Sequence, residues 1–362
     1  MKSKFLILRL IILIFFFTPV LEALKLDLLY EKLEEPTPEW IMKQIHHDLS
    51  PYTTELSRKS LDELFSNNDY CLVRVQVVDG KMTFQKSEWA KVHQVADWII
   101  QLLRVFSTLV RLPDVDFVFS CHDSIKLKGT PLPIFIISKK KQDHGLILYP
   151  DWYSLRGFEP DRTLVLEGNV LYPWESKKPL LFFRGSDSGI TDWDQWLNCP
   201  RPKLMEMSVQ RPDLIDAKFN YLFNHHIIGE QAKALGYMGE YVSMRDSSCF
   251  KYAMDIDGNC AATPRMPLLM HSTSVILKNT TDSVLWFYPR VKPYEHFIPV
   301  AEDLSDLFIK LEWAKNHDAQ CQKISTNARR LAAEIFNNEL IYVYLYRLLV
   351  EYAEKQKMYY HE

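Results

Sequence analysis

Residues 251–265, KYAMDIDGNCAATPR, carry the strongest chemical signal in this sequence. A short apolar run is followed by the turn Asp257-Gly258-Asn259, then by Thr263 as a candidate helix N-cap and Pro264 at the first helical position. A helix N-terminus presents unpaired N–H groups to anions, and Arg265 would add a positively charged fork. The stretch therefore predicts a diphosphate site. The open alternative is an ordinary αβ turn with a surface arginine, because isolated phosphate-loop signals are weak.

Two more polar sets directly follow apolar runs. Arg184-Gly185-Ser186 follows the run 180–183, and fits a phosphate- or sugar-binding turn because glycine permits close backbone approach while Ser and Arg donate. Its alternative is a plain turn. Asp123 follows the run 115–119, where a carboxylate can act as a general base. The neighbouring His122 could be the base instead, or both could be loop residues.

The elements that must position these groups alternate between helices and apolar strands, which favours a parallel α/β fold. The stretch 251–265 and the apolar run 275–277 together form one βαβ unit. Residues 86–112 are expected to form one helix, and 322–355 a long helical stretch that breaks at Asn337-Asn338. The apolar positions of the first helix are Trp89, Val92, Val95, Ile99, Leu102, Phe106 and Leu109.

A length of 362 residues suggests about two domains. We expect an N-terminal lobe over 24–170 that carries Asp123, a C-terminal lobe over 171–330, and a final helix over 331–362 that packs back on the lobes. In open α/β sheets, ligands bind at the carboxyl ends of strands. All three polar sets follow a strand, so we expect them to belong to a cleft between the lobes.

Composition and motifs argue against several classes of function. A net charge of −3 gives no reason to expect nucleic-acid binding. The chain lacks the G-x-S-x-G, H-E-x-x-H and P-loop patterns of hydrolases, zincins and nucleotide triphosphatases. Six cysteines are scattered without a C-x-x-C pair, which argues against a zinc site and permits disulfides without requiring them. Three D-x-D pairs, at 114/116, 192/194 and 255/257, are interpreted as structural.

The first 23 residues differ from the rest. Lys2 and Lys4 precede an apolar run from 5 to 20, and Ala23 is a candidate cleavage point. This pattern predicts a secretory signal peptide, with an uncleaved signal anchor as the alternative. Either would place the body of the chain in the lumen of the secretory pathway, such as the endoplasmic reticulum, or in a bacterial periplasm or envelope.

Several stretches together resemble one family, glycosyltransferase family 90, which includes the Rumi-type protein O-glucosyltransferases and their capsule- and lipopolysaccharide-associated relatives. The resemblance extends over about 113–355, and its motifs occur in family order. They are LPDVDFVFSCHDS, PLPIFIISK, HGLILYPDW, LFFRGS, KYAMDIDGNCAATPR, FYPRVKPYEHFIPV, DLSDL and LLVEYA. Many of these relatives carry a basic residue shortly after the RGS turn, whereas 187–191 has none here.

The resemblance implies a GT-B fold of two Rossmann-like lobes facing a cleft, and an inverting transferase that uses a UDP-sugar without a cofactor or a metal. It places the catalytic base at Asp123. The nucleotide sugar would be bound by Arg184, Gly185, Ser186, Cys260, Ala261, Ala262, Thr263, Pro264 and Arg265. Glucose or xylose would pass to a serine of a protein or to a glycan such as lipopolysaccharide. The alternative is a non-catalytic protein that retains the fold and binds a glycan or a partner.

Overall fold

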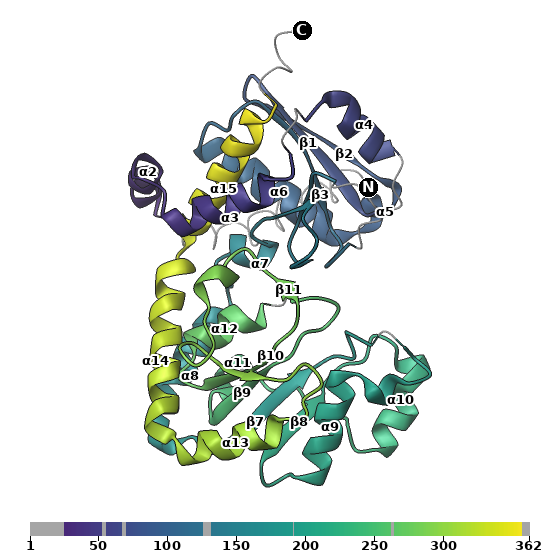
Figure 1. Cartoon of the computed structure of the whole chain (residues 1–362), viewed down its shortest axis with the longest axis vertical. Coiled ribbons are helices and arrows are strands. Elements are labelled where there is room, and N and C mark those ends of the chain that lie inside the picture. The colour runs from purple at the N-terminus through teal and green to yellow at the C-terminus, as the bar shows by residue number, and fades with distance from the viewer. Residues whose placement is uncertain are drawn as a thin grey trace, which may run out of the picture. The chain divides into compact units, whose positions relative to one another are not determined.

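The computed structural model describes residues 25–52, 56–66, 70–125, 132–190, 192–261 and 264–356, and the predicted signal segment lies outside these ranges. The chain divides into two compact units (Figure 1). Unit 1 comprises Met1–Glu159, Val284–Pro289 and Phe336–Glu362, and unit 2 comprises Pro160–Ser283 and Arg290–Ile335. Within the described ranges, no helix has both the length and the apolar character needed to span a bilayer.

Unit 1 is built on a five-stranded mixed sheet with the order β2-β1-β3-β4-β6. The elements of this unit are α2 (Leu26–Glu34), α3 (Glu39–Leu49), α4 (Arg58–Ser66), β1 (Leu72–Val78), β2 (Lys81–Lys86), α5 (Glu88–Val92), α6 (Gln94–Leu109), β3 (Val115–Ser120), β4 (Ile134–Ile136), β5 (Lys139–Lys140), β6 (Leu146–Leu148), α7 (Trp152–Leu155) and α15 (Asn338–Glu354).

The strand β3 is the centre of this sheet, and all six of its residues are buried. It pairs antiparallel with β1 and parallel with β4, and β4 in turn pairs parallel with β6. The β1–β2 hairpin turns at Asp79 and Gly80, whose positive φ values of 48° and 72° suit a two-residue hairpin turn. In the sequence, Asp-Gly between the runs 72–78 and 82–84 predicts a hairpin at this position, and the structure confirms it.

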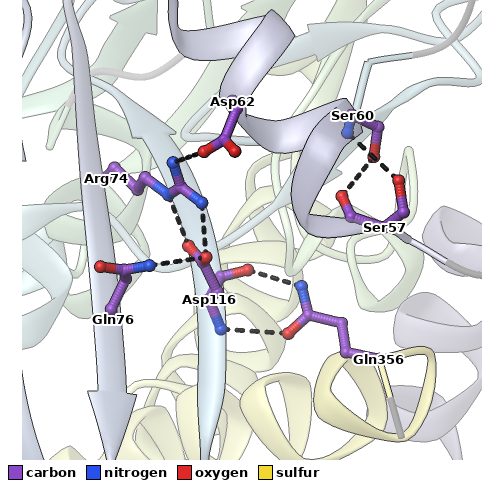
Figure 2. A network of polar contacts seen from close by, with 7 residues as sticks. All are labelled: Ser57, Ser60, Asp62, Arg74, Gln76, Asp116 and Gln356. Carbon is purple, nitrogen blue, oxygen red and sulfur yellow. Dashed lines mark hydrogen bonds and ion pairs between the residues drawn. The ribbon is translucent and has the colours of Figure 1, made fainter. Parts of the chain in front are cut away.

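A buried polar network fixes the start of β3 (Figure 2). Arg74 on β1 donates Nε and Nη2 to the Asp116 carboxylate at 2.8 and 2.6 Å. Gln356, just after α15, brackets the same residue, because its amide donates to the Asp116 carbonyl at 2.6 Å and accepts from the Asp116 N–H at 3.0 Å. Asp116, from one of the D-x-D pairs, thus links both β1 and the C-terminal end of the chain to β3.

The predicted helix over 86–112 was wrong in one respect. The structure divides it into α5 and α6 at His93, whose backbone is extended with φ −91° and ψ 112°. Trp89 and Val92 on α5 are 64% and 82% exposed, so they do not continue the buried face of α6. The three- and four-residue spacing of apolar residues runs through the break, which is why periodicity alone could not show it.

Unit 2 is built on a second five-stranded sheet, in which every pairing is parallel. Its elements are α8 (Asp161–Leu171), η1 (Trp174–Ser176), β7 (Lys178–Gly185), η2 (Trp196–Asn198), α9 (Pro200–Gln210), β8 (Ile215–Phe219), α10 (His225–Ala234), α11 (Met244–Ser247), β9 (Phe250–Asp255), α12 (Arg265–His271), β10 (Val275–Asn279), β12 (Ile298–Val300), α13 (Leu307–Asn316) and α14 (Asp318–Ile335). β11 (Ser283–Val284) and η3 (Tyr288–Arg290) fall where the chain passes between the units.

The strand order in unit 2 is β12-β10-β9-β7-β8. The chain goes from β7 outward to β8, then returns past β7 to β9 and continues to β10 and β12. Strand order therefore reverses between β7 and β9, and this switch point is where doubly wound sheets bind ligands, beyond the carboxyl ends of the strands. The α/β fold class with parallel strands is confirmed.

The core of unit 2 explains why this sheet forms. The central strands β9 and β10 are buried along almost all of their length, as expected for parallel strands covered on both faces, whereas buried and half-buried residues alternate along the edge strand β8. Helices α9, α10, α13 and α14 contribute to a single apolar cluster with the strands, and Leu204, Ile228, Leu311 and Ile324 are members from these four helices. Asn337 begins α15, its side chain accepting from the Leu340 N–H at 2.8 Å, so the predicted break near Asn337 is confirmed.

Candidate functional site

The turns after β7 and β9 meet at the switch point of unit 2. Arg265, the first residue of α12, donates Nη2 to the Arg184 carbonyl at 2.6 Å. Its guanidinium lies over the Phe183 ring, 4.5 Å from the centroid. A Cβ added at Gly185 would lie 3.3 Å from the same Nη2 atom, so glycine suits this close approach. Two of the predicted stretches, separated by about 80 residues, thus form one structure.

The side chain of Arg184 lies elsewhere in the same unit. Its guanidinium packs over Phe182, 4.7 Å from the ring centroid, and pairs with the Asp216 carboxylate on β8 at 2.7 Å. Successive residues of a strand point to opposite faces. Arg184 therefore contributes its backbone carbonyl to Arg265, while its charge is paired with β8.

A third arginine, Arg201 on α9, joins the two turns. It donates to the Ser186 carbonyl at 2.9 Å and to the Ser188 hydroxyl at 2.5 Å. It also donates to the Ile256 and Asp257 carbonyls at 3.1 and 3.2 Å. The side chain is only 5% exposed, so these bonds form away from water. Arg201 thus braces the turn after β7 against the turn after β9.

The same two turns also pack backbone against backbone. Gly189 has φ +88°, and a Cβ there would lie 2.9 Å from the Gly258 carbonyl oxygen. A Cβ at Gly258 would lie 2.6 Å from the Ser188 hydroxyl oxygen. The Gly189 N–H also donates to the Asn259 side chain at 3.0 Å. Glycine suits Gly189 for its conformation and for the nearby backbone, and at Gly258 a side chain would displace the Ser188 hydroxyl or the Arg201 guanidinium.

Burial makes it costly to keep the two arginine side chains of this site charged. It lowers the pKa of Arg201 to about 10, with the charge of Arg265 the next cause and three nearby aspartates opposing. Burial also lowers the pKa of Arg265, with Asp255 opposing. Both guanidinium groups stay charged at neutral pH, and among the described residues neither is seen to bond a carboxylate. An anion placed beside them would be stabilised.

Both aspartates of the D-x-D pair at 255/257 form ion pairs with Lys278 on β10. Its ammonium donates to Asp255 Oδ2 and to Asp257 Oδ1, both at 2.9 Å. Thr281 donates its hydroxyl to the second carboxylate oxygen of Asp257 at 2.6 Å. A lysine that bonds both carboxylates holds the strand ends of β9 and β10 together, which gives this pair a structural role.

The rest of the predicted loop is described in part. Cys260 and Ala261 are buried. The prediction placed Pro264 at the first helical position, whereas α12 begins one residue later, at Arg265, and Pro264 directly precedes it. Ala262 and Thr263 lie outside the described residues, so the predicted N-cap at Thr263 stays a prediction. Ser186 contacts Ser188, with 3.3 Å between the two hydroxyl oxygens.

Asp123, the predicted base, belongs to unit 1 and follows the carboxyl end of β3 by three residues. Its side chain is exposed, and the preceding turn is held by the His122 N–H, which donates to the Ser120 hydroxyl at 3.1 Å. The pKa of His122 is lowered by burial and then by His93, with Asp123 opposing, so the imidazole is neutral at neutral pH. The His122 imidazole could therefore accept a proton, as the sequence alternative requires.

Sequence reasoning did not identify Arg201 or Lys278. Both lie in stretches without a motif, and their acceptors lie 13–56 and 21–23 residues away in the chain. The only local signal in the sequence was the lack of a basic residue over 187–191, where the family resemblance leads us to expect one. In the structure the basic group that contacts this turn comes from α9.

Comparison with known proteins gives a family match and several similar sequences. Residues 35–361 match the model of Glycosyl transferase family 90. The chain is 32% identical to human Protein O-glucosyltransferase 3 over 71% of this chain and 50% of that protein. It is 25% identical to rat Protein O-glucosyltransferase 1 over 86% of this chain and 79% of that protein. The chain thus spans about half the length of the first of these relatives.

Among solved structures, the crystal structure of Anabaena Alr3699/HepE in complex with UDP and glucose aligns with 58% of this chain and 58% of that chain, at 11% identity and a TM-score of 0.38. Sucrose-phosphate synthase from Thermosynechococcus elongatus aligns with 61% of this chain and 52% of that chain, at 10% identity and a TM-score of 0.34.

Proposed function

The chain belongs to glycosyl transferase family 90, and from this premise we propose that it is an inverting glycosyltransferase that uses a UDP-sugar. The acceptor is a hydroxyl of a protein serine or of a glycan, and glucose or xylose is the sugar transferred. The observation that carries the proposal is the convergence of the RGS turn and the Arg265 turn at the switch point of an all-parallel sheet.

The donor half of the proposal rests on the different roles of two arginines. Arg201 uses its N–H groups on four protein acceptors. Among the described residues, Arg265 shows one acceptor, the Arg184 carbonyl. A guanidinium carries five N–H donors, so Arg265 keeps donors for a ligand while Arg201 holds the turns in place. A diphosphate is the ligand whose charge and oxygen atoms this arrangement suits.

The acceptor half rests on Asp123. An exposed carboxylate just beyond a buried strand can take the proton of an acceptor hydroxyl, and that oxygen then attacks the anomeric carbon as UDP leaves. Attack from the side opposite to UDP inverts the anomeric carbon. Arg265 stabilises the negative charge that develops on the leaving diphosphate.

We propose that no metal ion takes part at the nucleotide site. Metal-dependent transferases of another class hold a divalent cation with a D-x-D pair, and the pair nearest this site, Asp255 and Asp257, is held by the Lys278 ammonium at 2.9 Å on each side. A cation there would have to displace that lysine. Activity should accordingly not depend on added Mg²⁺ or Mn²⁺ when measured at constant ionic strength.

The relatives are named for transfer of glucose to proteins, and this favours a protein acceptor within the proposal. Such an acceptor would be met in the lumen of the secretory pathway, as the predicted N-terminal signal segment also suggests. A membrane anchor at the N-terminus and a bacterial envelope location are the alternatives that the sequence left open.

The test is thermal unfolding of the full chain with UDP, with UMP as the matched ligand that lacks the second phosphate. A ligand at 100 times its Kd stabilises the folded state by about 2.7 kcal/mol, so millimolar UDP should raise the Tm by several degrees and UMP by less. UDP-sugars are then screened for transfer or hydrolysis. No shift with UDP would contradict the proposal, and a shift without turnover of any UDP-sugar would favour the non-catalytic binding protein.

A further inference from the structure

Unit 1 brings together three metal-ligating side chains that are far apart in the sequence. The Cys71 and Cys121 thiols and a ring nitrogen of His93 all lie within 4.8 Å of one another. Both cysteines are buried, at 0% and 5% exposure, and His93 is half-buried. None of the three belongs to the nucleotide site, which lies in unit 2.

The sheet accounts for this convergence. Cys71 directly precedes β1 and Cys121 directly follows β3, and the two strands are antiparallel with Leu72 opposite Ser120. The pairing continues one residue further, because the Cys121 N–H donates to the Cys71 carbonyl at 2.8 Å. The break between α5 and α6 supplies the third group, since the extended backbone of His93 interrupts the helical run there.

The His93 imidazole carries an independent sign of a missing partner. Its Nδ1 atom is buried, and the structure shows no hydrogen-bond partner for it among the described residues. A buried polar atom without a partner costs about 1–3 kcal/mol, so such atoms are uncommon unless a ligand or an ion satisfies them. A metal ion bound through Nδ1 and the two thiolates would satisfy this atom, whereas a disulfide between the two cysteines would leave it without a partner.

We propose that Cys71, Cys121 and His93 bind a borderline-soft divalent cation of the zinc type. Two thiolates and one imidazole are a ligand set that zinc accepts, with water in the fourth, tetrahedral position. Each cation bound replaces two thiol protons, which are released to solvent, and no electron is transferred. The sequence alone argued against a zinc site, because none of the three residues has a second ligand at metal-motif spacing.

The proposed cation would tie the β1–β3 pair to the start of α6. Cys121 lies two residues before Asp123, so the same bonds would hold the turn that carries the proposed base. This consequence rests on the proposed function, but cation binding does not, and the two are measured separately. Metal content and cobalt spectra need no donor sugar and no acceptor.

The experiment uses the full chain, purified without thiol reductants and without chelators, with metal content measured by elemental analysis. One equivalent of zinc per chain is expected. After removal of zinc, titration with Co²⁺ alone should give the thiolate-to-cobalt charge-transfer band and the visible bands of tetrahedral cobalt. His93→Gln and Cys71→Ser should each weaken cobalt binding by more than the roughly 10–100-fold that loss of an outer-shell partner costs.

His46→Gln and Cys199→Ser are the matched controls, since both residues lie outside the cluster and should leave the titration unchanged. Circular dichroism of each variant shows whether it is folded, and His93→Gln removes the nitrogen ligand without placing a new group in the strand pair. Wild-type protein that binds neither zinc nor Co²⁺ would overturn the proposal. So would a mass two hydrogens lower with Cys71 and Cys121 protected from alkylation, because that result identifies a disulfide.

Discussion

The strand ends that carry the two proposed catalytic halves are built differently. At the ends of β7 and β9 in unit 2, Arg201 donates to four acceptors on two turns, and two glycines let those turns touch. At the end of β3 in unit 1, Asp123 is exposed, and the hydrogen bond shown for its turn joins neighbouring residues. In the first, one buried arginine joins two turns; in the second, an exposed carboxylate lies three residues beyond a strand whose end is bonded to Cys71 through the Cys121 N–H.

The difference follows from the chemistry proposed for each half. A diphosphate is bound by several donors at fixed positions, and holding those donors before the ligand arrives reduces the entropy lost on binding. A general base needs one carboxylate near one hydroxyl, and a large acceptor must be able to reach it. Three substitutions test this contrast and a fourth tests a helix cap away from both sites, from the largest expected effect to the smallest.

Asp123→Asn should lower the turnover of sugar transfer by about 10²–10⁴-fold, the usual contribution of a general base. The amide keeps the size of the side chain but cannot take the proton. UDP affinity, measured by calorimetry, should be nearly unchanged because the proposed nucleotide site consists of residues of unit 2. His122→Gln is the matched control on the same turn and should keep most of the activity. Full activity in Asp123→Asn together with loss in His122→Gln would reassign the base to His122.

Arg201→Met should destabilise the chain by about 3 kcal/mol or more, because each buried acceptor left without a donor costs about 1–3 kcal/mol. The acceptors that would lose their donor are the carbonyls of Ser186, Ile256 and Asp257. Denaturant unfolding gives the free energy, and calorimetry should show weaker UDP binding in the protein that remains folded. Arg211→Met removes an exposed arginine from the end of α9 as a control, and should change stability by less than about 0.5 kcal/mol.

Arg265→Ala should weaken UDP binding by about 1.5–3 kcal/mol, the range for a hydrogen bond to a charged group. Stability should change less than in Arg201→Met, since among the described residues Arg265 shows a single protein acceptor. Arg265→Lys keeps the charge without the fork and should have an intermediate affinity for UDP. Equal UDP affinity in all three proteins would remove this turn from the diphosphate site.

Asn337→Ala should destabilise the chain by about 1 kcal/mol through loss of the N-cap of α15. Asn337→Asp keeps an oxygen acceptor for the Leu340 N–H and should be nearly as stable as the wild type in thermal unfolding. Neither change should alter UDP affinity. A Tm drop in Asn337→Asp as large as in Asn337→Ala would show that the cap bond does not contribute.

Local patterns predicted those parts of the molecule whose causes are local. The Asp79-Gly80 hairpin, the strand that ends in Arg184-Gly185 and the helix break near Asn337 each depend on neighbouring residues, and each is present. The prediction of one helix over 86–112 was wrong at His93 because the apolar spacing continues through the break. Only the exposure of the α5 side chains distinguishes the two helices. Asp123 and the loop residues stay predictions of role.

The sequence by itself determined the family, the α/β class and the stretches that carry the chemistry, because these depend on residue types in chain order. Only the tertiary structure decided which side chains meet: Arg201 with the turns after β7 and β9, Lys278 with both aspartates of its D-x-D pair, and His93 with Cys71 and Cys121. Strand order and register bring these groups together across tens of residues. No spacing along the chain encodes that proximity.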